Sequence, residues 1–233
     1  MEEIEQRWLY ALSAPMVALN GASYSSPYYY HDGDDDQIDL ASSWNVASRE
    51  QLLDIVARMA DDGHATELNA AYWRYQRALP SDWQALLEQL SLRERILHDY
   101  AARTFLDCGF GGTRAWDLGR MGFLLRCGLR NDWISFDESL WLQGRLAVRA
   151  RHFYGSWSAY VAGYVIGRGL WGCSDLPDEQ LGRQLERQGS DPRNQHIIAS
   201  LSNDSASPFA ELPWHLELNL PEKPASLAES DWS

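Results

Sequence analysis

Cysteine is scarce in this chain, and its spacing excludes the disulfide-rich and zinc-binding classes of protein. Cys108, Cys127 and Cys173 are the three cysteines among 233 residues, and no two of them form a CxxC pair. An odd number of widely spaced cysteines does not fit a disulfide framework or a metal site built on paired thiols. We expect three reduced thiols inside the core of a cytosolic protein.

Long apolar runs are also lacking. The best candidate, residues 160–171, is shorter than the roughly 20 residues needed to cross a bilayer, and it contains Arg168. The amino-terminal segment MEEIEQRWLYAL is acidic where a secretory signal is basic, so no export signal is visible. These observations predict a cytoplasmic location and no membrane partner.

Positive charge is in deficit. The chain holds 20 Lys and Arg against 33 Asp and Glu, which gives a net charge of −13. An average surface of this kind repels nucleic-acid phosphates and anionic lipids. We therefore expect no nucleic-acid partner, whereas a basic protein partner fits the charge.

Tryptophan, in contrast, is abundant. Eleven Trp residues are spread from Trp8 to Trp232, in a chain that is 45% hydrophobic and 23% charged, as in an ordinary globular protein. A buried indole contributes a large apolar area and needs a partner for its N–H. Because the residues are spread and not clustered, we interpret them as packing anchors of a core more than as a ligand box.

Helix-start signals recur along the chain. A Ser followed three residues later by Gln or Glu, ahead of an apolar-periodic run, is typical of a capping box. The pairs are Ser48 with Gln51, Ser81 with Gln84, Ser91 with Glu94, and Ser135 with Glu138. The pattern predicts helices over 2–12, 49–60, 65–78, 82–90, 92–106, 114–126, 136–151, 156–170 and 178–188.

The connections between these segments are short, which favours antiparallel neighbours in a bundle. We expect a mostly all-α fold, a single-domain bundle of about seven to eight helices with a Trp-rich core. Alternating residues over 214–220 suggest a short strand or hairpin near the carboxyl terminus. The expected domain covers residues 1–220, and residues 221–233 are expected to form a disordered tail.

Two segments resemble ligand sites but depart from them in detail. Asp32, Asp34 and Asp36 alternate as in an EF-hand loop, yet Gln37 stands where that loop needs Gly and Ser43 where it needs Glu. The glycine-rich run CGFGGT, residues 108–113, precedes a helix as anion-binding turns do, but no strand comes before it and the Walker lysine is absent. A solvated acidic loop and a helix-to-helix corner are the simpler interpretations, and we predict no metal and no cofactor.

The segment around the acidic run is the candidate partner-binding site. Residues 20–37 form a long predicted loop in which tyrosines precede aspartates, and long loops are disproportionately functional or disordered. Tyrosine supplies rigid contact area, and acidity accelerates the encounter with a basic surface. The candidate partner-binding residues are Tyr28, Tyr29, Tyr30, Asp32, Asp34, Asp35 and Asp36.

Charged residues among the central helices are the candidates for chemistry. Asp117 and Arg120 lie three residues apart and so share a helix face, and Glu138 and Arg168 fall on the next two predicted helices. Such residues could form a substrate cleft, or they could be buried pairs that brace the helices, which is the interpretation we favour. No nucleophile has a recognisable base, and the six histidines show no HExxH spacing, so no catalytic residue is assigned.

Spaced motifs along the chain resemble the bacterial family known as domain of unknown function 1266. The resemblance extends over roughly residues 8–218, with its core over 44–218. The residues that carry it are AWDLGRMGFLLRCGL from Ala115, Trp133-Ile134-Ser135 with Glu138, Gly155-Ser156-Trp157, Tyr160, Tyr164, Gly167-Arg168, Trp171, Trp44, Val46, Ser48-Arg49-Glu50, Gly63-His64, Ser207-Pro208-Phe209 and Leu212-Pro213-Trp214. At Trp133 the family more often has a smaller aromatic residue or a Gly-Tyr arrangement, and the Tyr-rich acidic stretch 28–36 is particular to this chain. The resemblance implies a bacterial, helical, single-domain protein and no established activity.

Two functional hypotheses follow from these observations. The first is a non-enzymatic protein that binds another protein, as an accessory or immunity-type factor for a basic partner. The alternative is a hydrolase with Asp117, Arg120, Glu138 and Arg168 in a cleft between the central helices. Raised carboxyl pKa values in an open pocket would favour the enzyme, whereas buried and mutually paired side chains would favour a structural role.

Overall fold

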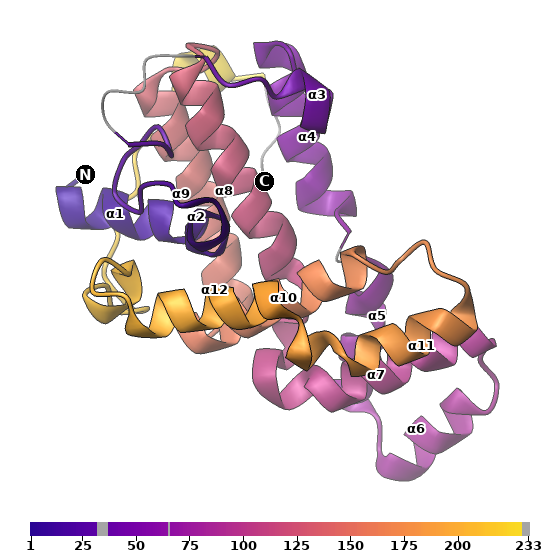
Figure 1. The fold of residues 1–233 in the computed structure, drawn as a ribbon. Helices are drawn as coiled ribbons and strands as arrows, with labels where there is room; N and C mark the ends of the chain where they lie inside the picture. Colours follow the sequence, from indigo (N-terminus) through magenta and orange to yellow (C-terminus); the bar gives the residue numbers. More distant parts are fainter. Residues whose placement is uncertain (32–36, 65, 230–233) are drawn as a thin grey trace. The chain divides into compact units, whose positions relative to one another are not determined.

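The computed structural model describes residues 1–31, 37–64 and 66–229 of the chain (Figure 1). Its α-helices are α1 (Glu3–Ala11), α2 (Ala14–Asn20), α3 (Ala41–Trp44), α4 (Arg49–Asp62), α5 (Thr66–Arg77), α6 (Pro80–Leu87), α7 (Leu92–Cys108), α8 (Arg114–Arg130), α9 (Phe136–Phe153), α10 (Trp157–Trp171), α11 (Asp178–Glu186) and α12 (Pro192–Asn203). Short 3-10 helices occur at η1 (Gly109–Gly111), η2 (Gln188–Ser190), η3 (Pro208–Ala210) and η4 (Ala225–Leu227). No described helix has both the length and the hydropathy that a membrane span requires.

The predicted all-α fold class is confirmed, and the helix count was underestimated. The extra helices are α2, α3 and α12, in segments that the sequence analysis left outside its helices. Pro15 explains α2, because proline ends α1 but is well suited to the first turn of the next helix. Pro80 has the same effect in α6, which begins at Pro80 with Leu79 as its N-cap, so Ser81 is not the cap that its spacing to Gln84 suggested.

The expected strand over residues 214–220 is wrong, since the described residues contain no strand. Trp214 and His215 form a turn, in which the Leu216 N–H donates to the Pro213 carbonyl at 3.1 Å, and residues 216–220 are irregular. Other polar backbone atoms of this segment pair with side chains: the Asn219 N–H donates to Glu5 Oε1 at 2.6 Å, and the Leu216 carbonyl accepts from Arg151. The alternation of apolar and polar residues over 214–220 therefore indicates a segment with one face packed on helices, and not a strand of a sheet.

Residues of the described chain gather into two compact units, where the sequence analysis expected one domain. Unit 1 contains residues 1–61, 118–152 and 199–233, and unit 2 contains residues 62–117 and 153–198. Neither unit is a continuous stretch of sequence, and the four divisions fall within α4, α8, α9 and α12. Interleaving of this kind leaves no linker in the sequence from which the division could be read.

The expected disordered tail differs from the structure over residues 221–229. Here η4 forms, Leu227 is buried, and the Ser226 hydroxyl donates to Glu138 Oε1 at 2.6 Å. Residues 230–233 lie outside the described part of the chain. The Lys223 ammonium also lies 5.4 Å from the Trp141 ring centroid, so several contacts hold this segment on the rest of unit 1.

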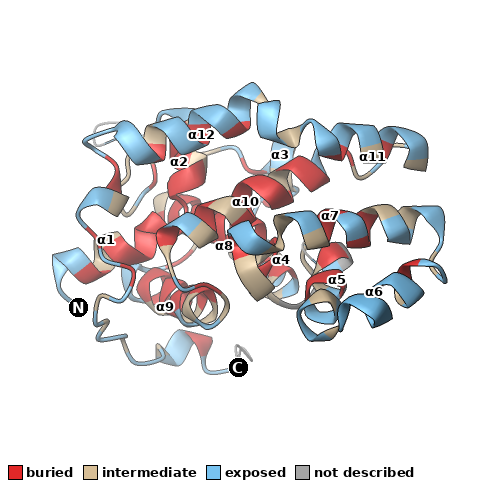
Figure 2. Cartoon of the chain, turned by 90° about the horizontal axis from the view of Figure 1, so that it is seen from below, coloured by how far each residue is buried: buried red, intermediate tan, exposed pale blue. Residues whose placement is uncertain are grey.

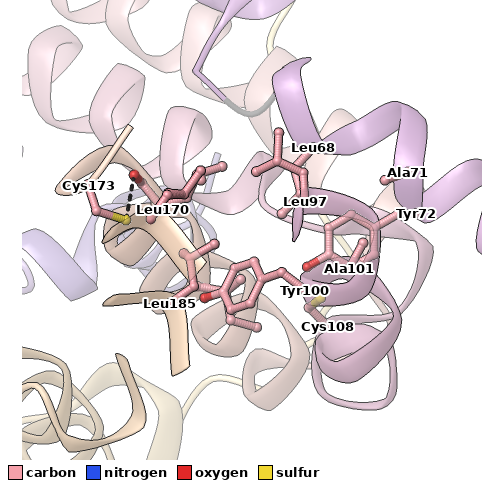
Figure 3. Close-up of a cluster of buried hydrophobic side chains, with 12 residues drawn as sticks. Leu68, Ala71, Tyr72, Leu97, Tyr100, Ala101, Cys108, Leu170, Cys173 and Leu185 are labelled. Carbon is pink, nitrogen blue, oxygen red and sulfur yellow. Dashed lines mark hydrogen bonds between the residues drawn. The ribbon is translucent and has the colours of Figure 1, made fainter. Parts of the chain in front are cut away.

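Unit 2 is built on an apolar cluster from α5, α7, α10 and α11 (Figure 3). Leu68, Tyr72, Tyr100 and Leu185 are among its buried members. The Tyr72 hydroxyl lies 2.6 Å from Thr104 Oγ1, which gives this buried polar group a partner. The cluster shows why α7, of modest amphipathicity, is ordered: α5, α10 and α11 all pack against it.

The glycine-rich run 108–113 is a packing corner, as the sequence analysis favoured. Gly112 has a φ of +56°, and a Cβ added there would lie 2.4 Å from the Tyr72 ring. On α10, a Cβ at Gly163 would lie 2.5 Å from the Gly112 carbonyl oxygen, and one at Gly167 would lie 2.6 Å from the Trp116 Cβ. Glycine at these positions permits helix α10 to approach the corner closely.

The tryptophans are only partly the core anchors that were expected. Those classed as buried are Trp8, Trp83, Trp116, Trp157 and Trp214, whereas Trp73 and Trp171 are exposed and Trp232 lies outside the described residues. Figure 2 shows the same mixture along the chain, with α8 and α10 mostly buried and α6 mostly exposed. All three cysteines are free and buried, and burial raises the pKa of the Cys108 thiol to about 11.

Candidate functional site

A pocket of about 610 Å³ opens in unit 1 between α1, α2, the loop over residues 21–31, and the end of α12. Apolar side chains from α2 form part of its wall, including Val17. The titratable side chains in the lining are Arg7, Tyr24, His31 and Asp204. A concave site with a few polar groups is the usual form of a ligand-binding pocket.

The loop 21–31 is shaped by its own hydrogen bonds. Gly21 ends α2 in the left-handed region, with a φ of +62°, and turns the chain away from the helix axis. His31 Nε2 lies 3.1 Å from the Gly21 carbonyl oxygen, which brings the two ends of the loop together. Between them, the Ser23 N–H donates to the Tyr29 carbonyl at 2.8 Å. The pocket wall is therefore a closed loop with internal order.

Arg126 on α8 anchors this loop from inside unit 1. Its side chain is fully buried, and its guanidinium donates to the carbonyls of Ser23 at 2.6 Å and Ser26 at 2.5 Å. A further hydrogen bond goes to the Ser13 hydroxyl at 2.7 Å, and the Tyr29 ring centroid lies 5.0 Å from the cation. Burial lowers the pKa of Arg126 to about 10, so the group stays protonated at neutral pH. Removing this cation would leave the Ser23 carbonyl unpaired, whereas the Ser26 carbonyl would keep only the Tyr29 N–H, at 3.3 Å.

Charge in the pocket is set by Asp204 and Arg7. Arg7 pairs with Glu211, with 2.6 Å between Nη2 and Oε2, so this cation is already neutralised. Asp204 follows the last residue of α12, and its carboxylate accepts the Ala206 N–H at 2.9 Å. Burial and the nearby Asp204 carboxylate both raise the pKa of Tyr24. The uncompensated charge among these lining residues is negative.

The predicted partner-binding residues separate into four groups. Tyr28 is exposed, so it is available for contact. Tyr29 is fully buried against Phe123, with 4.8 Å between ring centroids, and burial raises its pKa well above the usual range. Tyr30 is half-buried. Asp32, Asp34, Asp35 and Asp36, together with the EF-hand-like spacing, lie outside the described residues.

Glu138, one of the four residues predicted as candidates for chemistry, belongs to an ion pair. Arg49 binds it with two hydrogen bonds, of 2.8 Å from Nη1 and 2.5 Å from Nη2. The Ser135 N–H donates to the same carboxylate at 2.7 Å, as its capping box predicted. Arg49 and these hydrogen bonds outweigh burial and lower the Glu138 pKa to about 2. The carboxylate is thereby held ionised, which is the reverse of what a general acid needs at neutral pH.

The remaining three predicted residues lie in different surroundings. Asp117, in unit 2, is buried and accepts the His64 N–H at 3.2 Å. Arg168, also in unit 2, donates to Asn194 Oδ1 at 2.9 Å and to Asp191 Oδ2 at 3.2 Å. Arg120, in unit 1, lies with its guanidinium 4.9 Å from the Trp44 ring centroid. Of these three residues, Arg168 has a carboxylate partner, and the bracing role of the group stays a prediction.

A tyrosine side chain satisfies one backbone N–H at the start of α8. The Tyr154 hydroxyl accepts the Ala115 N–H at 2.8 Å and lies 3.0 Å from the Gly112 carbonyl oxygen, to which it donates. One orphan N–H of the helix start is thus satisfied within unit 2. Among the residues that the structure describes, no group of three or more His, Cys, Asp or Glu side chains could hold a metal ion.

Sequence reasoning missed Arg126, Arg49 and Asp204. Arg126 had a signal, since it interrupts the apolar run from Phe123 to Cys127, and a charge in such a run is buried only when it has partners. Arg49 and Asp204 had none, because their roles depend on Glu138 and on the loop over residues 21–31. Both relations are long-range and emerge only when the chain is folded.

Comparison with known proteins places the chain among bacterial relatives. The family described as "Protein of unknown function (DUF1266)" matches residues 39–214. Two similar proteins of Escherichia coli strain K12 are "Uncharacterized protein YbeU", 39% identical, and "Uncharacterized protein YbeR", 37% identical. Each alignment spans 218 residues and covers 92% of this chain and 92% of the relative. No solved structure matches the chain.

Proposed function

Because this chain belongs to the DUF1266 family, which has no assigned activity, its function must be inferred from its own geometry, and we propose that it binds a basic protein partner. The observation that carries the proposal is the uneven distribution of charge. Each unit has ten Lys and Arg residues, but unit 1 has twenty Asp and Glu against thirteen in unit 2. Unit 1 therefore has a net charge of −10 and unit 2 one of −3.

A concentrated negative charge has a definite effect on association. It steers a basic partner towards the charged face and repels acidic competitors, which raises the association rate at low salt. Exposed aromatic area is the second requirement of a binding face, and Tyr28 supplies it in unit 1. We assign the binding face to unit 1, with Tyr28 and the aspartates over residues 32–36 as contact residues.

Such a protein would act without catalysis, as an accessory or immunity-type factor that neutralises its partner. The hydrolase alternative has less support, because Glu138 has a lowered pKa and a bidentate arginine. A cytoplasmic location is part of the proposal. Buried free thiols at all three cysteines suit a reducing compartment.

Affinity capture from the bacterial host tests the proposal. The immobilised protein should retain a stoichiometric partner of basic isoelectric point, and retention should fall as the salt concentration rises from about 50 to about 200 mM. Absence of a stoichiometric partner at both salt concentrations would refute the proposal. So would a partner whose retention does not depend on salt.

Matched charge variants locate the face. The unit 1 variant carries Glu3→Gln, Glu217→Gln and Glu222→Gln, all at exposed positions. The control carries Glu88→Gln, Asp107→Asn and Asp175→Asn, at exposed positions of unit 2. Both remove three charges, but only the first should slow association with the captured partner. Equal slowing would show that net charge alone matters and that unit 1 holds no binding face.

A further inference from the structure

Asp204 lies where a carboxylate adds to an existing negative potential. The carboxyl end of a helix carries partial negative charge and free carbonyls, and it favours a cation. Helix α12 has no basic residue in its last turn, so its own sequence does not supply that cation. Asp204 comes directly after this end, and among the described residues no Lys, Arg or His pairs with it.

The rest of the pocket suits a cation that carries hydrogen-bond donors. Ser23, Ser25 and Ser200 line it with hydroxyl groups, which accept hydrogen bonds from an ammonium or a guanidinium. Val17 and Ala18 provide an apolar wall for an aliphatic stem. A long cationic side chain has this combination of an apolar stem and a polar tip.

The pocket is also prepared before a ligand arrives. Arg126 fixes the loop through the carbonyls of Ser23 and Ser26, at 2.6 Å and 2.5 Å. Glu211 holds Arg7, so the one arginine of the lining does not oppose an incoming cation with a full unpaired charge. A preorganised wall reduces the entropy lost on binding.

We propose that this pocket receives the cationic tip of an Arg or Lys side chain, with Asp204 as its counter-ion. The proposal rests on the proposed function, because it supplies the anchor by which a basic partner is held. A volume of about 610 Å³ accommodates such a side chain together with water. The chemistry recognised is an ammonium or guanidinium on an aliphatic stem, whether it belongs to a protein or to a small free amine.

Titration of the purified full-length chain tests the pocket without any partner. The probes are n-propylguanidinium and n-butylammonium, which reproduce the two side-chain tips, and the neutral butyramide is the control ligand. Backbone amide shifts in ¹H–¹⁵N spectra should move for residues 21–31 and 200–206 with a dissociation constant of about 1 mM. Butyramide should produce no saturable shift.

Asp204→Asn identifies the counter-ion. It should weaken binding of both cations at least about tenfold, because an ionised partner makes the stronger hydrogen bond. Glu50→Gln is the matched control, since it removes one exposed carboxylate of unit 1 that does not line the pocket. It should change the dissociation constant less than about twofold. Unchanged thermal melting of both variants verifies that the fold is intact.

A pentapeptide with a central Arg and blocked ends distinguishes the source of the cation. A protein side chain is indicated if the peptide binds at least as tightly as n-propylguanidinium, and a small free amine if only the free cations bind. Binding of either kind that depends on Asp204 supports the pocket. Absence of saturable binding by both cations, or equal binding by Asp204→Asn and the parent chain, overturns it.

The two proposals fail in different ways. If host capture yields a basic partner whose affinity is unaffected by Asp204→Asn, the function stands and the pocket is not its anchor. If the cations bind through Asp204 but no partner is captured, the pocket stands and the protein-binding function fails. The two experiments therefore give independent answers.

Discussion

The ion pair between the partly exposed Arg49 and the buried Glu138 yields the sharpest stability prediction. Replacing Glu138 by Gln keeps the size and one carbonyl oxygen of the side chain but removes its charge. The amide can still accept the Ser135 N–H, which donates to the carboxylate at 2.7 Å. The Arg49 guanidinium, by contrast, loses its counter-ion and the hydrogen bond from Nη2 to Oε1, and it keeps its bonds to the remaining amide oxygen and to the Trp133 carbonyl, the latter at 3.0 Å.

The size of the effect follows from the Glu138 pKa. Its fall from an ordinary 4.5 to about 2 corresponds to roughly 3 kcal/mol, at about 1.4 kcal/mol for each pKa unit. The Arg49 side chain is 38% exposed, so water screens part of the attraction. We expect Glu138→Gln to lower the free energy of unfolding by about 2 kcal/mol at pH 7.

The pH dependence has a definite sign. A carboxyl group whose pKa is lowered by folding stabilises the folded state fully above its unfolded pKa, here near 4.5, and loses that contribution as the pH falls through about 2. The difference between the parent chain and Glu138→Gln should therefore be greatest at pH 7. By pH 3 it should have decreased to less than about half.

Urea denaturation followed by far-ultraviolet circular dichroism measures these differences. Glu211→Gln serves as the control, because it breaks the pair with Arg7 in which the Glu211 side chain is 59% exposed, and it should cost less than about 1 kcal/mol. Equal stability of the parent and Glu138→Gln at pH 7 would refute the reasoning. A difference that stays constant from pH 7 to pH 3 would show that packing, not charge, is responsible.

Three further substitutions test other parts of the fold. Arg126→Met should lower the free energy of unfolding by about 1–3 kcal/mol, because it leaves the Ser23 carbonyl unpaired and removes the arginine bonds of the Ser26 carbonyl. Hydrogen exchange should accelerate over residues 21–30, and a loop with unchanged protection would contradict the anchoring role. Tyr154→Phe should cost about 1–3 kcal/mol in a urea titration, since it removes the acceptor of a buried helix-start N–H, and no measurable loss would contradict this contact. Gly167→Ala should lower the free energy of unfolding by about 1–3 kcal/mol, because its Cβ would lie 2.6 Å from the Trp116 Cβ. Gly172→Ala is the control, since the nearest neighbour of its Cβ would be at 3.5 Å, and it should change the melting temperature little. Equal effects of the two substitutions would count against close packing at the corner.

Local signals in the sequence were sufficient for the helices. The Ser91–Glu94 and Ser135–Glu138 spacings predicted helix starts that the structure confirms, because a capping box closes within one helical turn. The glycine corner was also anticipated, since helices were predicted on both sides of it. The signal failed at Ser81 because Pro80 competed for the same helix start, and a proline in the first turn needs no cap of that kind.

The composition determines the net charge of the protein, whereas the fold determines where on the molecule the charged residues gather. The net charge of −13 is a property of the sequence, but its concentration in unit 1 depends on which distant segments fold together. The same holds for the tyrosines, which are consecutive in sequence: the φ of Tyr29, +72°, and the Arg126 cation bring its ring inside while Tyr28 stays exposed. Hydrophobic periodicity and composition cannot show which of two consecutive tyrosines is buried and which is exposed.

The sequence by itself determined that this protein is helical and acidic and that it belongs to a family with spaced Trp, Gly, Asp and Arg positions. The tertiary structure alone decided which charges are paired. Glu138 and Arg49 are 89 residues apart in the chain, and the pocket combines Tyr24 with Asp204. The physical reason is range: helix formation depends on residues within a few turns, whereas an ion pair or a pocket depends on contacts between segments that sequence patterns do not relate.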